Sequence, residues 1–257
     1  MIRYPKYREG KNYTVPEGTE RIGTYAFEPY VLEEVTIAST VKEIDKHAFR
    51  FITAVHFSEG LEKIGDNAFS GCRDLNEVFL PESLQEIGSR AFEFSGEEAP
   101  VIHMPPHLKT TGESAVVSRG ISGEIEEVIL DDLEQAKFPI FEGFTIGSYR
   151  VADDNPYFCT VQGMLFSKDR RTLYAVPSAW EGECRIPEGT ARIDSYAFND
   201  CIYITDLYVP SSVKNSAGAI PINTETQDTA YTVHCPSGSD TARELEEKQL
   251  SWTVWDE

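Results

Sequence analysis

The sequence contains little that would direct it to a membrane or to a disulfide-stabilised fold. No stretch of its 257 residues approaches the apolar length of a membrane-spanning helix, and residues 1–10 lack the apolar run of a secretory leader. The five cysteines are odd in number and form no Cys-x-x-Cys pair, so we expect reduced, mostly buried thiols. Unless a leader was removed beforehand, these absences favour a cytoplasmic protein without membrane insertion.

Basic residues are also scarce. Lys and Arg together number 23 against 43 Asp and Glu, which gives a formal net charge of -20. Nucleic-acid affinity comes mostly from cations that displace counterions from phosphates, so this charge disfavours a nucleic-acid partner. The ordinary interpretation is a solvated acidic surface that keeps the protein in solution.

Motifs of enzymes and metal sites are absent as well. The sequence has no Gly-x-Ser-x-Gly, no His-Glu-x-x-His and no phosphate-binding glycine loop. His103 and His107 have the spacing of a helical metal pair, but Pro105 and Pro106 lie between them and exclude a helix interior. The acidic run at 153–155 ends in Asn-Pro, which is typical of a turn. We therefore expect no cofactor, no metal and no enzymatic activity.

A six-residue phrase, Ile-(Gly/Asp)-x-x-Ala-Phe, recurs along the chain. The phenylalanines of its first four copies are Phe27, Phe49, Phe69 and Phe92, at spacings of 22, 20 and 23 residues. This period lies in the 20–29 residue range of leucine-rich repeats. Cys72 follows one of these phenylalanines by three positions, and Cys201 follows Phe198 in the same way, which indicates small core residues. The copies lie at 22–27, 44–49, 64–69, 87–92 and 193–198, with a worn copy at 111–116.

Short alternating segments accompany the phrases. Because a strand has period two, the outer residues of a triplet point to one side and the middle residue to the other. Clear triplets lie at 35–37, 55–57, 78–80, 128–130 and 207–209. A further apolar residue three positions before the Ile predicts a second extended segment on the opposite wall of each coil. It occurs as Val41, Leu61, Leu84 and Leu108.

One such coil cannot bury its own apolar residues, whereas stacked coils align them into continuous columns. The sequence therefore predicts a mostly β fold with a minor helical part: a right-handed leucine-rich-repeat solenoid with short strands, turns and a C-terminal helix. We expect a single domain over 1–257, with an N-terminal cap at 1–12, repeats over 13–236 that are degenerate around 95–150, and a C-terminal cap at 237–257. The segments 131–144 and 215–230 are expected to be irregular.

The two ends of the stack would expose apolar residues, so we expect a capping segment at each end. At the amino end the capping residues are Tyr4, Tyr7 and Tyr13. Near the carboxyl end, Ser239 or Asp240 can cap a helix through about Gln249. The apolar residues expected to close the core after it are Leu250, Trp252 and Trp255.

Three segments carry a resemblance to a known family. Residues 68–81, which read AFSGCRDLNEVFLP, resemble the BspA-like leucine-rich repeat, and 154–177 look like that family's longer hairpin-bearing repeat, with a hairpin near 161–176. Cys-Pro-Ser-Gly-Ser at 235–239 resembles its usual ending. The resemblance implies a bacterial, often surface-attached or secreted protein, and several such proteins are adhesins or binding proteins. A cell-surface location is thus the alternative to the cytoplasm.

The outward residues of the strands form the candidate site. A row of apolar side chains among polar groups indicates an interaction face for a protein or a glycan. The alternative is a structural or self-associating repeat protein without a ligand. The residues of the hypothetical binding face are His56, Phe79, His103, Ile129 and Tyr208, with Glu34, Glu77 and Glu127 one register further along it.

Overall fold

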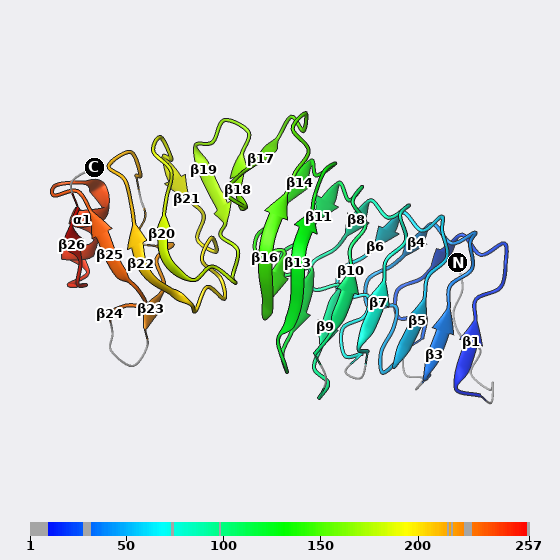
Figure 1. Ribbon diagram of the computed structural model, residues 1–257. Helices are drawn as coiled ribbons and strands as arrows, with labels where there is room; N and C mark the ends of the chain where they lie inside the picture. The colour runs from blue at the N-terminus through cyan, green and yellow to red at the C-terminus, as the bar shows by residue number, and fades with distance from the viewer. Residues whose placement is uncertain are drawn as a thin grey trace. The chain divides into compact units, whose positions relative to one another are not determined.

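The chain divides into two compact units, Met1–Thr145 and Ile146–Glu257. The computed structural model describes residues 10–27, 32–72, 75–97, 99–214, 216, 218–223 and 228–255. Both units consist mostly of short strands, and the part of the chain described contains one helix (Figure 1). The predicted mostly β solenoid fold is confirmed. The single domain over 1–257 stays a prediction, and Tyr4 and Tyr7 of the predicted cap lie outside the described residues.

The first wall of unit 1 is formed by three-residue parallel strands. Their middle residues, such as Val35 and Val78, are fully buried, while the flanking residues point outward, as the alternation predicts. The strands begin one residue before the triplets seen in the sequence. We call their outward side the strand-lined face. The strands are β1 (Asn12–Thr14), β3 (Glu34–Thr36) and β5 (Ala54–His56) in one sheet, β7 (Glu77–Phe79) and β10 (Val101–His103) in a second, and the longer β13 (Gly123–Ile129), which contacts β10.

The second wall is a six-stranded parallel sheet of two-residue strands, which lie side by side in Figure 1. Ile22, Ile44, Ile64 and Ile87 are paired in register along it and are all buried. The second extended segment expected from the sequence is thus confirmed. The strands are β2 (Arg21–Ile22), β4 (Glu43–Ile44), β6 (Lys63–Ile64), β8 (Glu86–Ile87), β11 (Thr110–Thr111) and β14 (Gln135–Ala136).

The repeat phenylalanines form a column inside unit 1. The rings of Phe27 and Phe49 stack at a centroid distance of 4.6 Å, and Phe69 stacks on Phe49 and Phe92 at 4.9 Å each. Tyr13 of β1 packs against Phe27 at 5.5 Å. A third parallel sheet begins at Phe92, the last phenylalanine of this column. Its strands are β9 (Phe92–Phe94), β12 (Val116–Ser118) and β15 (Phe141–Glu142).

Residues 131–144 are more regular than the sequence predicts. Strand β14 pairs in register with β11, and β15 pairs with β12, so this segment completes an ordinary coil. Thr111 occupies the position of the column isoleucines and is buried, although its hydroxyl has no hydrogen-bond partner among the described residues. The backbone ladder therefore persists where the side-chain phrase is worn, because ladder hydrogen bonds do not depend on side chains.

Unit 2 contains the predicted hairpin. Strands β17 (Phe158–Val161) and β18 (Met164–Ser167) pair antiparallel, and β18 pairs with β19 (Thr172–Ala175) in the same way. The turn residues Gln162 and Gly163 have φ of 53° and 81°, the left-handed values that tight hairpin turns need. The remaining strands are β16 (Phe144–Arg150), which spans the unit boundary, β20 (Gly182–Arg185), β21 (Arg192–Ile193), β22 (Ile204–Tyr208), β23 (Ile222–Asn223), β24 (Asp228–Thr229), β25 (Thr232–Cys235) and β26 (Thr253–Val254).

The carboxyl end contains the predicted helix, α1 (Asp240–Glu247). The Ser239 hydroxyl accepts a hydrogen bond from the Ala242 amide at 3.1 Å and caps it. Leu250 is buried and Trp252 packs against the core of unit 2, as expected. Trp255 was expected there too, but its ring packs in a T-shaped contact with Tyr208 on the outward side of β22, so that prediction was wrong. The segment before the last strands, expected as a loop, contains the antiparallel pair β23–β24.

Candidate functional site

The residues predicted for the binding face divide between the two units. Those of unit 1 project from the outward side of β3, β5, β7, β10 and β13, and all are exposed or half-buried. Tyr208 projects from β22 in unit 2 and is described with that unit. The unit 1 residues are Glu34, His56, Glu77, Phe79, His103, Glu127 and Ile129.

Phe79 is the most exposed apolar residue of the strand-lined face, with 58% of its surface accessible. Its ring stacks on the imidazole of His103 in the next coil, with centroids 4.1 Å apart and planes within 5° of parallel. A nitrogen of His103 lies 3.9 Å from a carboxylate oxygen of Glu77. This stack holds an exposed aromatic ring in one orientation.

His56 and Glu34 occupy the same face on the neighbouring coils. The His56 Nε2 lies 2.7 Å from a Glu34 carboxylate oxygen, and the Asn12 side-chain amide donates to the other oxygen at 2.8 Å. Glu127 and Ile129, on β13, are exposed and half-buried respectively. The face of unit 1 thus combines one fixed aromatic ring with acidic groups.

A related cluster surrounds Tyr208 in unit 2. The guanidinium of Arg185 lies 3.7 Å above its ring, and the imidazole of His234 stacks on the ring at 4.3 Å. His234 also hydrogen-bonds to Asp206 at 2.8 Å, and this bond, followed by that from Thr205, lowers the pKa of the Asp206 carboxyl from its ordinary value. Because the ring of Tyr208 is covered in this way, it presents less apolar surface than Phe79.

The two clusters follow one pattern, which the sequence interpretation did not recognise. An acidic residue and an aromatic residue lie two positions apart on one strand, and a histidine on the next strand stacks on the aromatic ring. The members are Glu77, Phe79 and His103 in unit 1, and Asp206, Tyr208 and His234 in unit 2. The signal was present as Glu-x-Phe and Asp-x-Tyr, each followed by a histidine in the same strand position of the next coil.

A second candidate site, a trough over the second wall of unit 1, was not predicted. It is a hollow of about 460 Å³ that lies along the sheet from β2 to the residue after β14. Its floor consists of Gly65, Gly88 and Gly112, each of which directly follows a buried column residue. A Cβ atom at Gly88 would lie 2.5 Å from the backbone nitrogen of Asp66, so close packing of the coils requires glycine there.

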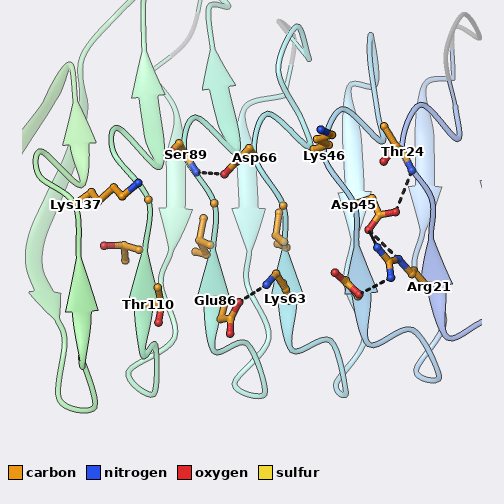
Figure 2. A pocket seen from close by; sticks show the side chains of 17 residues that line it. Arg21, Thr24, Asp45, Lys46, Lys63, Asp66, Glu86, Ser89, Thr110 and Lys137 are labelled. Atoms are coloured by element: carbon orange, nitrogen blue, oxygen red, sulfur yellow. Dashed lines mark hydrogen bonds and ion pairs between the residues drawn. The ribbon is translucent and has the colours of Figure 1, made fainter.

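Polar side chains form two rows beside this floor (Figure 2). Lys63 and Glu86 pair at 2.6 Å in one row, and in the other row the Asp66 carboxylate accepts a hydrogen bond from the Ser89 amide at 2.8 Å. The hydrogen bond to Glu86 raises the pKa of Lys63. In the position that glycine has in the floor, Asp45 precedes Gly65 and Lys137 follows Gly112, and Arg21 and Thr24 line the trough beyond Asp45. The trough is therefore bounded and polar.

Other kinds of site are not found in the part of the chain that the structure describes. No group of three or more His, Cys, Asp or Glu side chains is arranged to hold a metal ion among these residues. Asn155, expected in a turn, accepts hydrogen bonds from the amides of Tyr157 and Phe158 at 2.8 and 2.9 Å. Cys72 and Cys201 are buried as expected. Within the same described ranges, no helix is long and apolar enough to cross a bilayer.

Comparison with known proteins bears on the fold and the family. A family model described as the BspA type leucine rich repeat region matches residues 6–117 and 182–220 in six copies, which is more than half of the chain. No match was found among curated proteins.

Two solved structures have similar folds. The pneumococcal vaccine antigen PcpA matches with a TM-score of 0.66 and 25% identity, over 85% of this chain and 60% of that one. A leucine rich cell surface protein from Faecalibacterium prausnitzii A2-165 matches with a TM-score of 0.57 and 20% identity, over 82% of this chain and 67% of that one. This chain spans three fifths of the length of the pneumococcal protein.

Proposed function

Because the chain belongs to the BspA-type leucine-rich repeat family, we propose that it is a non-catalytic scaffold whose strand-lined face in unit 1 binds another protein. The observation that carries the proposal is Phe79, an aromatic ring that is 58% exposed and yet held by stacking on His103. Large apolar side chains exposed in a fixed orientation are typical anchors of protein interfaces. A ring that is already ordered loses little conformational entropy on binding.

The acidic groups around this ring determine the chemistry of the partner. Glu34 and Glu77 flank the histidines of the face, Glu127 lies on β13, and the whole chain has a net charge of -20. Complementary potentials speed association and select partners. The proposed partner is therefore a protein that presents basic residues around an apolar pocket. Self-association is disfavoured, because two copies of this acidic face repel each other.

A surface location on a bacterial cell is part of this proposal. One similar structure belongs to a vaccine antigen and another to a cell surface protein, as their descriptions state. At the outside of a cell, an exposed repeat face would meet other proteins. Antibody labelling of intact cells tests the location, and labelling that requires permeabilised cells would contradict it.

The test of the binding face is the simultaneous substitution His56→Ala, Phe79→Ala and His103→Ala. These side chains lie outside the core, so we expect each change to alter stability by within about 0.5 kcal/mol. We expect the wild-type chain to capture a basic protein from an extract of its native source, with an affinity that falls as salt is added. The triple variant should lose this capture.

A matched control removes exposed apolar surface elsewhere. Ile202 and Tyr203 are exposed in a turn of unit 2, so the double substitution to Ala leaves the strand-lined face intact. Retained capture by the triple variant, or equal loss in the control, would reject this face. Light scattering over a range of concentrations tests the alternative of a self-associating protein, for which the mass of the wild-type chain would rise with concentration.

A further inference from the structure

We infer that the trough over the second wall of unit 1 is a separate binding site for a short, linear, uncharged oligosaccharide. The trough lies over β2, β4, β6, β8, β11 and the residue after β14, whereas the strand-lined face belongs to other strands of the same coils. The inference concerns a different surface and a different ligand from those of the proposed function.

The dimensions of the trough favour an extended ligand. Arg21 and Thr24 line one end of the trough and Lys137 the other, and the three glycines lie between them. Five strand spacings, from β2 to β14, separate these ends, or about 24 Å at about 4.8 Å per spacing. Its volume of about 460 Å³ lies within the range of about 300–1,000 Å³ that is usual for ligand sites. A short linear molecule lying along the stacking direction fits these limits.

The charges of the trough favour an uncharged ligand. Its lining contains four basic and four acidic side chains, so it is formally neutral in a chain with a net charge of -20. Arg21 pairs with Asp45 at 2.6 Å and Lys63 with Glu86 at 2.6 Å, so much of this charge is already compensated inside the trough. The basic residues are Arg21, Lys46, Lys63 and Lys137, and the acidic residues are Glu43, Asp45, Asp66 and Glu86.

The hydrogen-bonding groups distinguish a sugar from a peptide. The amides of Gly65, Gly88 and Gly112 each donate to the preceding coil at 2.8 Å, so the floor offers no free backbone donors for pairing with a peptide. Recognition must come from the side chains of the two rows, which contain basic donors, carboxylate acceptors and hydroxyl groups (Figure 2). A sugar hydroxyl donates and accepts at once, and so it can satisfy both kinds of group.

The experiment removes one charged pair of the trough and compares it with a matched pair outside it. The trough variant is K63A/E86A. The control is K42A/E62A, because Lys42 and Glu62 pair at 3.3 Å between neighbouring coils but do not line the trough. Both pairs are exposed, and exposed pairs contribute little to stability. A conservative variant, K63R/E86D, keeps both kinds of hydrogen-bonding group.

The probe is an array of linear oligosaccharides that are uncharged, contain uronic acids or are sulfated, followed by calorimetric titration of the best ligand. We expect uncharged oligosaccharides to bind the wild type, the control and K63R/E86D, with affinity about ten- to a hundredfold weaker in K63A/E86A. Circular dichroism confirms that each variant is folded. The His56, Phe79 and His103 variant should bind them normally, which separates this inference from the proposed function.

Three results would overturn the inference. The first is no binding of any uncharged oligosaccharide on the array. The second is binding confined to acidic or sulfated sugars, which would assign the trough to anions through Lys46 and Lys137. The third is equal affinity in K63A/E86A and K42A/E62A, which would place the bound sugar elsewhere on the chain.

Discussion

The phrase Ile-x-x-x-Ala-Phe occurs in both units, but its phenylalanine packs differently in each. In unit 1 the rings of Phe27, Phe49, Phe69 and Phe92 stack face to face at 4.6 to 4.9 Å. In unit 2 the ring of Phe198 makes a T-shaped contact with Tyr231, with centroids 6.0 Å apart. The phrase thus determines the shape of its own coil, whereas the neighbouring coil determines what the phenylalanine packs against.

The neighbours explain this difference. In unit 1 the next coil repeats the phrase, so like residues meet in a column. In unit 2 the phrase packs in a core cluster of unlike residues, which includes Phe166 and Leu173 of the hairpin strands and the thiols of Cys184 and Cys201. Unit 1 is therefore the more repetitive core and unit 2 the more heterogeneous one.

The largest expected effect is the loss of stability in two variants, Phe69→Ala in unit 1 and Phe198→Ala in unit 2. Both side chains are at most 2% exposed, so each substitution should lower the free energy of unfolding by about 3–5 kcal/mol. Phe69 also loses two stacked partners, and we expect its cost to exceed that of Phe198 by about 1 kcal/mol. Urea denaturation followed by circular dichroism measures both.

Tryptophan fluorescence provides the readout for unit 2 in this comparison. All three tryptophans, Trp180, Trp252 and Trp255, lie in unit 2, so their emission follows the unfolding of that unit. If circular dichroism shows that the Phe69→Ala variant unfolds at the same urea concentration as the wild type, the stacked column is contradicted.

A smaller effect is expected from Gly88→Ala in unit 1. The added methyl would lie 2.5 Å from the backbone nitrogen of Asp66, so neighbouring coils must separate, at a cost of about 1–3 kcal/mol. Gly218→Ala in unit 2 is the control, because no atom lies within 4 Å of a Cβ there. We expect the control to change stability by less than about 1 kcal/mol. Equal midpoints of the two variants in thermal denaturation would contradict the required close approach.

The smallest expected effect concerns the reactivity of the cysteine thiols and does not involve a change in stability. Burial raises the pKa of the Cys72 thiol to about 12, and burial raises the pKa of Cys184 to about 12 and of Cys235 to about 11. At pH 8, a thiol with a pKa near 12 is ionised in about one molecule in ten thousand, so these groups should resist iodoacetamide.

Cys159, which is half-buried, is the site that we expect the reagent to modify in the native protein. The label should therefore appear in unit 2 and leave unit 1 unmodified, as peptide mass spectrometry of the treated protein would show. Labelling of Cys72 at pH 8 without denaturant would mean that the column of unit 1 opens readily. Full labelling of all five thiols after unfolding is the control.

Much of the fold could be predicted because it depends on periods that are visible in one sequence. The alternation around Val35 and Val78 predicted which strand residues are buried, and the spacing of the phenylalanines predicted their column. The coil at 131–144 was missed because Ala136 replaces the usual Ile and Ile140 replaces the usual Ala, although Phe141 keeps the position of the repeat Phe. Backbone bonds such as that from the Lys137 amide to the Thr111 carbonyl, at 3.1 Å, maintain its shape nevertheless.

The candidate sites were predictable only in part. The exposure of Phe79 and His103 follows from strand alternation, but their stacking depends on the register between coils whose strands are 24 residues apart. The trough was missed because its floor is open only where glycine has no side chain, and sequence patterns were searched for side chains that are present. Its signal was nonetheless present, since a glycine follows the column residue at 65, 88 and 112.

The glycine floor of the trough also bears on how such a molecule can evolve. The coils of Gly65 and Gly88 each add one glycine to the floor and one residue to each row, while Arg21 with Thr24 and Lys137 line the two ends. A duplicated coil between β6 and β8 would lengthen the trough by about 4.8 Å and leave both ends chemically the same. Gene duplication within the repeat array can therefore alter the length of molecule accommodated in single steps, without a new arrangement of side chains.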